Sequence, residues 1–227
     1  IPSVEMLYLA GIENTIKTAK DMGITSLNGN YYGLSLVLGG GEVKLLDEVA
    51  AYGVFANEGV KNSKTPILRI EDKSGNVLEE YKSDPKKVME PQITRLVSDI
   101  LSDNNARTPV FGANSALYFP GLPVAAKTGT TQKYRDAWTL GYTPSLVAGI
   151  WVGNNDNTSM SRAGAGLAAA GPLWHEFIKK AYELKTNCDD STANAFCLPK
   201  NVEQFTKPDP INTDKSMLTG SYFSTQT

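Results

Sequence analysis

Three strand-like runs in close succession constrain the fold of this chain more than any other feature. They cover residues Pro123–Thr131, Asp136–Tyr142 and Leu146–Asn154. Turn residues separate them, Gln132–Arg135 first and Thr143–Ser145 second. Connections this short make antiparallel pairing of consecutive strands the simplest topology. The sequence therefore predicts a three-stranded antiparallel sheet.

The third run also predicts how the sheet is covered. Leu146–Val152 is almost uniformly apolar, which is typical of a strand buried on both faces, so we expect helices on each side of the sheet. One such helix begins at Pro172 and carries Trp174 in an amphipathic pattern, because proline is tolerated in the first helical turn. Another helical face begins at Val43 and ends near Gly59.

Further elements precede the sheet. Residues 3–22 carry an apolar stripe at helical spacing that Gly11 interrupts, so two short helices fit best. Ile67–Glu71 and Val77–Tyr81 flank a turn and predict a small peripheral hairpin. Pro91 then opens another helix, and a loop rich in Asn, Pro and Gly follows it.

Composition excludes several classes of function. The chain has 227 residues, of which 41% are hydrophobic and 20% charged, as in a globular protein. Its 22 Lys and Arg against 24 Asp and Glu give a net charge of −2, which provides no electrostatic footprint for nucleic acid. With one His and two Cys, a four-ligand zinc site is not expected. The cluster Gly39–Gly41 lacks the lysine and hydroxyl residue of a phosphate loop, so nucleotide binding is not expected either.

The composition changes beyond about Lys185, where polar residues dominate. We therefore expect one structured portion over residues 1–185 and a polar C-terminal extension over residues 186–227. The extension holds Cys188 and Cys197, the only cysteines; on these grounds a disulfide and two free thiols remain equally open.

No apolar stretch approaches the ~20 residues of a membrane-spanning helix. The chain begins with Ile1 and not with Met. We therefore expect a domain excised from a longer protein, which leaves a membrane anchor in the parent open.

One tetrapeptide in the first strand combines residues suited to chemistry. In Lys127–Thr130, strand alternation places Lys127 and Gly129 on one side and Thr128 and Thr130 on the other. A cation and two hydroxyls beside a residue without a side chain suit a substrate carboxylate, and the Thr130 N–H suits a developing oxyanion. From the tetrapeptide alone, a surface strand with an exposed lysine remains an equal alternative.

The surroundings of this tetrapeptide resemble a known family. K-T-G is one of three motifs of penicillin-binding proteins and serine β-lactamases, together with S-x-x-K and an S-x-N type triplet. The matching segments are Tyr32–Val43, Ala51–Asn57, Ala125–Thr131, Arg135–Trp138, Gly141–Pro144 and Trp151–Asp156. Together they resemble the transpeptidase module of class A penicillin-binding proteins, from Ile1 to roughly Ala181. The resemblance implies an α/β (α+β) fold with an antiparallel sheet flanked by helices, β-lactamase/transpeptidase-like and incomplete in this chain.

The resemblance also implies an activity. The intact enzyme attacks the D-alanyl-D-alanine end of a peptidoglycan stem peptide and passes the acyl group to an amine of a neighbouring stem, and β-lactams mimic that end and trap the serine. Lys127 would tune the second-motif serine and attract the terminal carboxylate, and the Thr130 N–H would supply half of the oxyanion hole. Thr128, Gly129, Thr130 and Thr131 would bind substrate. No metal or organic cofactor is implied.

This chain departs from the family at the nucleophile. Ser3 is followed three residues later by Met6, and Ser83–Lys86 lies in a charged, proline-bearing loop, so no S-x-x-K stands in a plausible place. In the family S-x-N comes immediately before an Ile-Pro pair, which here is Ile1 and Pro2. The chain thus resembles the C-terminal part of a transpeptidase domain, and we expect no acylation of this chain alone.

The resemblance further implies partners and a location. The partners are stem peptides, β-lactams, the missing N-terminal part of the same domain, a glycosyltransferase domain and a membrane anchor, at the extracytoplasmic face of the bacterial plasma membrane. That compartment favours a disulfide between Cys188 and Cys197. Without the rest of its sheet the chain should expose an unpaired edge and self-associate. The alternatives are a non-catalytic or vestigial binding module of the same fold, and a D,D-carboxypeptidase or β-lactamase.

Other residues with reactive side chains have structural explanations. His175, the only histidine, has no serine or cysteine nucleophile pattern near it, so we expect a structural role. Asp136 and Arg135 are expected to form a local turn or ion pair. Trp138, Trp151 and Trp174 are expected in the core or in a cleft wall.

Overall fold

A computed structural model of the chain describes residues 2–161, 166–184, 197–199 and 201–210. Its centre is an antiparallel sheet of β5 (Ala125–Thr130), β6 (Asp136–Tyr142) and β7 (Val147–Gly153), in that order. The predicted strands and their topology are confirmed. The register sets Lys127 opposite Leu140.

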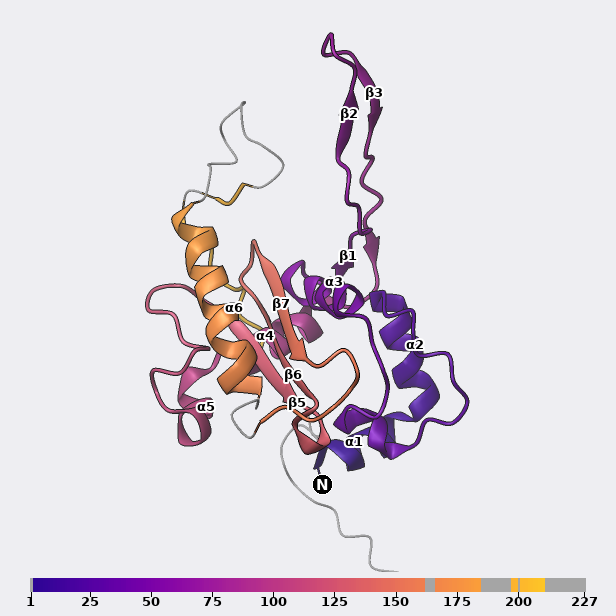
Figure 1. Cartoon of the computed structure of the whole chain (residues 1–227), viewed down its shortest axis with the longest axis vertical. Helices are drawn as coiled ribbons and strands as arrows, with labels where there is room; N and C mark the ends of the chain where they lie inside the picture. Colours follow the sequence, from indigo (N-terminus) through magenta and orange to yellow (C-terminus); the bar gives the residue numbers. More distant parts are fainter. Residues whose placement is uncertain (1, 162–165, 185–196, 200, 211–227) are drawn as a thin grey trace, which may run out of the picture.

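Helices cover both faces of the sheet (Figure 1). On one face, α3 (Leu45–Ala56) packs over Gly149, where an added Cβ would lie 2.6 Å from Val49. On the other face lies α6 (Gly166–Glu183), whose buried Trp174 Nε1 donates to the Ala148 carbonyl over 3.0 Å. The predicted covering of the third strand from both sides is therefore confirmed.

The helix α6 differs from its prediction at its start. It begins at Gly166, and Pro172 lies inside it instead of opening it. The residues between these two positions, Leu167–Ala170, are strong helix formers that extend the helix towards the N-terminus. The packed face of α6 makes up for the one backbone hydrogen bond that Pro172 cannot donate. Together with the sheet this face forms a core cluster of Leu117, Phe119, Val124, Ala126, Ala148, Trp174 and Ile178.

Two further helices come between the arm and the sheet in the sequence. α4 (Pro91–Ser102) begins at Pro91 as predicted and packs against β5 and α3. α5 (Asn104–Phe111) occupies a stretch that was expected to be a loop. Asp103 explains this helix, because its carboxylate accepts a hydrogen bond from the Ala106 N–H at 3.0 Å and caps the first turn.

The N-terminal quarter of the chain is helical. α1 (Pro2–Ala10) and α2 (Ile12–Met22) are the two predicted short helices, and they meet at Gly11, whose φ of 83° a residue with a side chain rarely adopts. The short 3-10 helix η1 (Leu34–Leu38) follows and ends at Gly39. A second core cluster joins this part to α3 through Met22, Ile24, Leu27, Ala51 and Val54.

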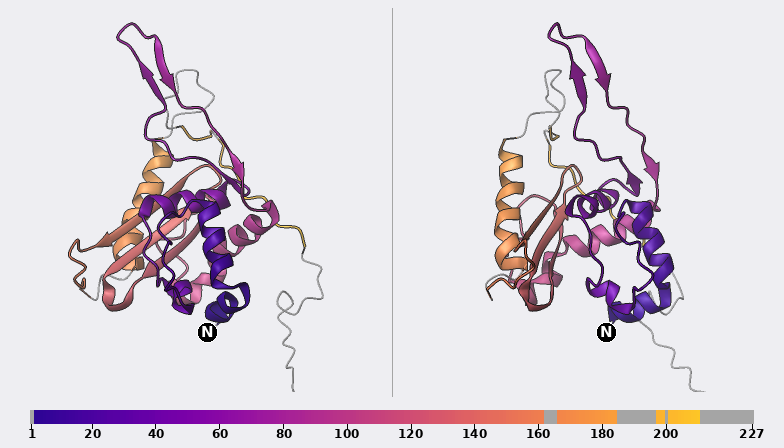
Figure 2. Two further views of the ribbon diagram at one scale, coloured as in Figure 1. Left: turned by 90° about the vertical axis from the view of Figure 1, so that its right-hand side faces the viewer. Right: turned by 45° about the vertical axis from the view of Figure 1, so that its right-hand side comes forward.

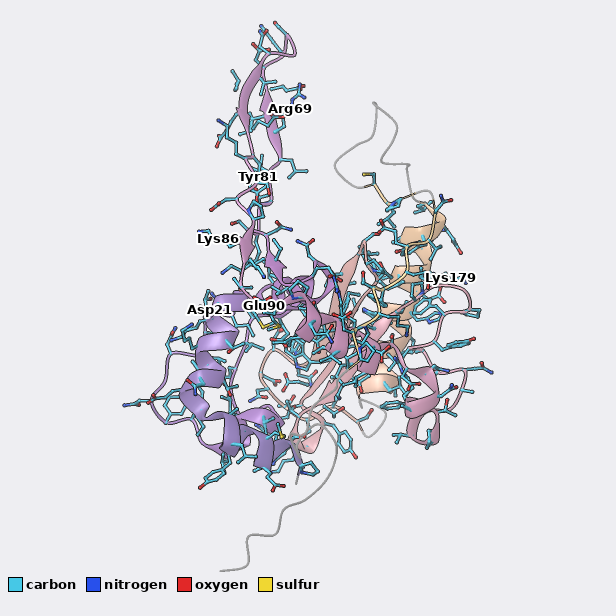
Figure 3. All side chains as sticks on the ribbon, turned by 180° about the vertical axis from the view of Figure 1, so that it is seen from behind. Asp21, Arg69, Tyr81, Lys86, Glu90 and Lys179 are labelled. Atoms are coloured by element: carbon cyan, nitrogen blue, oxygen red, sulfur yellow. The ribbon has the colours of Figure 1, made fainter. Side chains whose placement is uncertain are left out.

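A long hairpin, here called the arm (residues 60–87), projects from the body (Figures 1 and 2). At its base β1 (Val60–Lys61) pairs with β4 (Lys86–Lys87), and further out β2 (Arg69–Glu71) pairs with β3 (Val77–Glu80). Arg69 and Tyr81 lie along the arm, and Lys86 lies near its base (Figure 3). The predicted peripheral hairpin is confirmed.

Part of the C-terminal extension packs against the body. Leu198 is buried, and the Phe205 ring meets Tyr142 edge-on at 5.6 Å. The Gln92 Nε2 donates a hydrogen bond to the Asp209 backbone carbonyl, and the Asp209 N–H donates one to Gln92 Oε1, both at 2.9 Å. Cys197 forms a disulfide, while its expected partner Cys188 lies outside the described residues.

Within the described ranges, no helix combines the length and the apolar character needed to cross a bilayer.

Candidate active site

A cavity of about 780 Å³ lies against the strand that carries the tetrapeptide. One wall is made by residues 127–131 of the β5 end, together with Trp138 and Trp151 of β6 and β7. The facing wall comes from residues 37–39 and 41–43, at and after the end of η1, and from Leu45, Glu48 and Tyr52 of α3. A cavity therefore lies beside β5, and Trp138 and Trp151 line it, as expected of residues in a cleft wall.

Lys127 reaches this cavity from the face of the sheet that α3 covers. Its side chain is exposed and lines the cavity, and its Nζ donates a hydrogen bond of 2.6 Å to the Thr128 carbonyl. β5 is an edge strand in the described sheet, since only β6 pairs with it. The ammonium is thus accessible to a ligand that enters beside the strand.

Gly129 leaves room in the cavity wall. Its register partner is Trp138, and an added Cβ would lie 3.5 Å from the Trp138 Cβ, which is an ordinary contact. Packing within the described residues therefore does not require glycine here. The absence of a side chain instead keeps the space in front of the strand open.

The end of β5 is held by Asp136. The Thr131 hydroxyl donates to the Asp136 carboxylate at 2.7 Å and accepts from the Asp136 N–H at 2.8 Å. The other carboxylate oxygen accepts from Trp151 Nε1 at 2.9 Å. Asp136 therefore fixes both the turn, as expected, and one tryptophan of the cavity wall. The Thr131 hydroxyl proton is committed to this carboxylate.

Two residues of the facing wall were not identified from the sequence. Glu48 and Tyr52 lie one turn apart on α3 and both line the cavity. Burial raises the pKa of the Glu48 carboxyl, and burial with the nearby Glu48 charge raises the pKa of Tyr52. The available signal was a glutamate on the apolar face of a predicted helix, between Leu45 and Tyr52.

The remaining candidates lie away from the cavity. Ser83 and Lys86, which form the one S-x-x-K match in the sequence, are exposed on the arm. His175 stacks on Phe119 with ring centres 4.2 Å apart, and its Nδ1 lies 3.0 Å from the Ala116 carbonyl oxygen, so its role is structural. Across the described part of the chain, no group of three His, Cys, Asp or Glu could hold a metal ion. No serine is among the described residues that line the cavity.

Comparison with known proteins identifies the class to which this strand and cavity belong. The penicillin-binding protein transpeptidase domain matches residues 25–179. The chain belongs to this family.

The most similar relatives include two penicillin-binding proteins. Penicillin-binding protein 1A of Aquifex aeolicus is 34% identical over 187 residues, which cover 82% of this chain and 25% of that protein. Penicillin-binding protein 2D of Bacillus subtilis is 31% identical over 208 residues, which cover 89% of this chain and 28% of that protein. The chain thus spans about a quarter of the length of these relatives.

Solved structures of the family share the fold. Penicillin-binding protein 1A from Haemophilus influenzae superposes with a TM-score of 0.67 at 18% identity, over 93% of this chain and 39% of that chain. PonA1 from Mycobacterium tuberculosis gives 0.66 at 22% identity, over 91% and 57% of the two chains. The predicted antiparallel sheet flanked by helices, of the transpeptidase type, is confirmed.

Proposed function

We propose that this chain supplies the carboxylate-binding wall of a serine D,D-transpeptidase, and that the intact protein cross-links peptidoglycan stem peptides. The observation that carries the proposal is the cavity beside β5. The cavity is lined by the accessible Lys127 ammonium, by the two threonines of the tetrapeptide and by Gly129, which leaves the space in front of the strand open. No serine is among its described lining residues. Such a wall binds and orients a substrate, while the nucleophile comes from polypeptide outside this chain.

Each residue of the tetrapeptide has a role in this proposal. The Lys127 ammonium attracts the terminal carboxylate of a D-alanyl-D-alanine peptide, or the equivalent group of a β-lactam. The Thr128 and Thr130 hydroxyls donate hydrogen bonds to it. The Thr130 N–H provides half of the oxyanion hole, a contribution of about 3 kcal/mol in the transition state.

Two residues beside the tetrapeptide complete the wall. Gly129 keeps the approach to the strand open. The bonds of Thr131 to Asp136 favour a role in fixing the strand end rather than direct substrate binding.

The remaining parts of the enzyme belong to a longer protein. The S-x-x-K serine and the S-x-N triplet come from the N-terminal part of the same domain, and its glycosyltransferase domain and membrane anchor place the reaction at the extracytoplasmic face of the plasma membrane. The length of the relatives supports this proposal, since this chain matches about a quarter of each. The structure of PonA1 in complex with penicillin V supports the choice of β-lactams as probes.

Fluorescent penicillin tests the proposal directly. We expect covalent labelling of a longer form that includes the sequence preceding Ile1, and none of the 227-residue chain. In the longer form, Lys127→Ala should lower the labelling rate at least tenfold, whereas Lys180→Ala, on the exposed side of α6, should leave it unchanged. A stoichiometric adduct on the 227-residue chain, or no labelling of the longer form, would overturn the proposal.

The acceptor separates the enzymatic alternatives. With a stem-peptide donor and an amine acceptor, a transpeptidase releases a cross-linked product, whereas a D,D-carboxypeptidase releases only the shortened acid. A form that binds penicillin reversibly without acylation would instead be a vestigial binding module. Mass spectrometry of the products distinguishes these cases.

A further inference from the structure

The arm exposes an apolar surface that its own fold does not cover. All residues of β2 and β3 are exposed. Ile70 and Val77, on opposite faces of the ribbon, have 38% and 48% of their surfaces open to solvent. A two-stranded ribbon alone is at best marginally stable in water, and an open apolar edge favours pairing with another strand.

The arm is nevertheless a built element that is fixed at both ends. At its tip, the Asp72 carboxylate accepts hydrogen bonds from the backbone N–H groups of Ser74 and Asn76, at 2.8 and 2.9 Å. At its base, Lys64 pairs with the buried carboxylate of Asp47. The arm therefore presents β2 in a defined orientation.

The outer edge of β2 has backbone groups available for a further strand. The Leu68 carbonyl accepts from the Tyr81 N–H at 2.8 Å, and the Asp72 N–H donates to the Asn76 carbonyl at 2.9 Å, so both groups face β3. In an antiparallel ladder the direction of these groups alternates along the strand. Arg69 and Glu71 thus turn their N–H and C=O groups outward, where no described strand pairs with them.

We propose that two copies of this chain pair through β2, antiparallel, about a two-fold axis at Ile70. In this register the outward backbone groups of Arg69 pair with those of Glu71 of the second copy. By symmetry, the outward groups of Glu71 pair with those of Arg69 of the second copy. Within one chain the Arg69 guanidinium already pairs with the Glu71 carboxylate. In the paired copies each of these side chains also lies opposite its oppositely charged counterpart in the second copy, because residues opposite each other share a face of the sheet. The two Ile70 side chains meet at the axis in a non-hydrogen-bonded pair, where side chains lie closest.

Neighbouring registers on the same edge are less favourable. An axis at Leu68 sets Arg69 against Ile67 of the second copy, so the ion pairs between Arg69 and Glu71 do not form. An axis at Asp72 would require residues of the tip turn to pair with the second copy. The backbone of this turn bends away from the strand at Gly75, which has a φ of 84°.

The edge of β3 is a poorer partner for a second copy. The register shift between Ile70 and Glu71 leaves Leu78 without a partner in β2, so a bulge disrupts the outer edge of β3. An axis at Glu79 would then place two identical carboxylates directly opposite each other, which is destabilising. Charge complementarity therefore selects the β2 edge.

The contact is small, so it should be weak. Three or four residues from each copy bury much less than the about 1,000 Å² expected of a stable interface. We therefore expect monomers at low micromolar concentration and pairing at high local concentration. Disulfide cross-linking detects such a weak interface better than the elution volume in size-exclusion chromatography.

Cross-linking through Ile70→Cys tests the geometry in the full 227-residue chain. The non-hydrogen-bonded pair places the two Cα atoms about 4.5 Å apart, within the range a disulfide spans. We expect I70C to form covalent dimers under mild oxidation at least tenfold faster than Ser74→Cys, an exposed control at the tip. The wild-type chain, oxidised in parallel, measures any cross-linking through the native cysteines Cys188 and Cys197. Equal rates for I70C and S74C would overturn the proposal.

Charge reversal in the I70C background tests the register. Arg69→Glu faces Glu71 of the second copy, and Glu71→Arg faces Arg69, so each should lower the cross-linking rate at least fivefold. The double variant R69E/E71R restores both the ion pair within one chain and the pairs between copies, and it should restore the rate. A mixture of R69E and E71R chains, in which only the pairs between copies are attractive, should restore it as well. Lys180→Glu, which changes net charge as R69E does, is the matched control, and circular dichroism verifies the fold. A double variant that stays as slow as R69E, or an equal loss in K180E, would refute pairing through β2. This test requires no penicillin, so it is independent of the proposed function.

Discussion

Two glycines of the same sheet show how differently the same residue type is used. Gly129 faces the open cavity, and an added Cβ would make only an ordinary contact of 3.5 Å with Trp138. Gly141 lies on the face that α6 covers, and a Cβ there would approach Trp174 Cζ2 to 2.5 Å and the Ala125 carbonyl oxygen to 2.6 Å. One glycine borders the open cavity and the other is closely packed in the core.

We therefore predict different effects of two matched substitutions on the free energy of unfolding. Gly141→Ala should lower the free energy of unfolding by about 1–3 kcal/mol, because the carbonyl oxygen cannot move aside as a flexible side chain would. Gly129→Ala should change it by less than about 0.5 kcal/mol. Urea denaturation of the two variants and the wild type measures both values. Equal losses would show that Gly129 is also required by packing.

At the scale of elements, one buried carboxylate holds three segments together. Asp47, at the start of α3, is 3% exposed. Its Oδ2 accepts hydrogen bonds from the Thr25 N–H at 3.0 Å and the Thr25 hydroxyl at 2.6 Å, and its Oδ1 pairs with Lys64 of the arm. The Lys64 ammonium, and then the Thr25 hydroxyl, lower the pKa of this carboxyl from 3.8 to about 2.

This arrangement predicts a specific loss of stability in acid. The folded-state pKa of Asp47 lies below its unfolded value, so its contribution is complete above about pH 4 and is lost as the pH falls to about 2. Asp47→Asn should cost about 2 kcal/mol at pH 7, because charged hydrogen bonds are lost. The difference between wild type and D47N should then shrink towards pH 2. Urea denaturation at several pH values tests this, and parallel pH curves for the two proteins would contradict it.

How far the elements could be predicted depends on the range of the interactions that form them. Alternation and an apolar run predicted β5, β6 and β7 to within two residues, because these patterns are local. α5 was missed because its Asn and Pro residues and the glycine after it were read as a loop, whereas the cap at Asp103 starts a helix there. The first turns of α6 were missed because Pro172 was read as the start of the helix.

The residues of the candidate site also differ in whether a local pattern or a long-range contact places them at the cavity. The wall formed by Lys127–Thr130 follows from a short motif and was predicted. Glu48 and Tyr52 come from a helix some eighty positions earlier in the chain, and only the fold brings them to the same cavity. Nothing in their immediate sequence shows which element they face.

At the scale of the whole molecule, the described residues enclose the cavity on two sides. The segment around η1 that forms its far wall keeps apolar side chains in solvent, and Leu38 is 71% exposed. Exposed apolar groups that line a concave site mark a surface for another partner. In the proposed function that partner is the preceding part of the same domain.

Hydrogen exchange in a longer form that includes the sequence preceding Ile1 tests this expectation. Residues 34–43 should exchange at least tenfold more slowly than in the 227-residue chain, because covering the cavity stabilises this wall against local opening. Residues 67–82 of the arm project away from the body (Figure 2) and should exchange equally in both forms, so they serve as the internal control. The comparison is made at low micromolar concentration, below the expected pairing of arms. Unchanged exchange over residues 34–43 would mean that the preceding polypeptide does not cover this cavity, and the site would then have to be completed elsewhere.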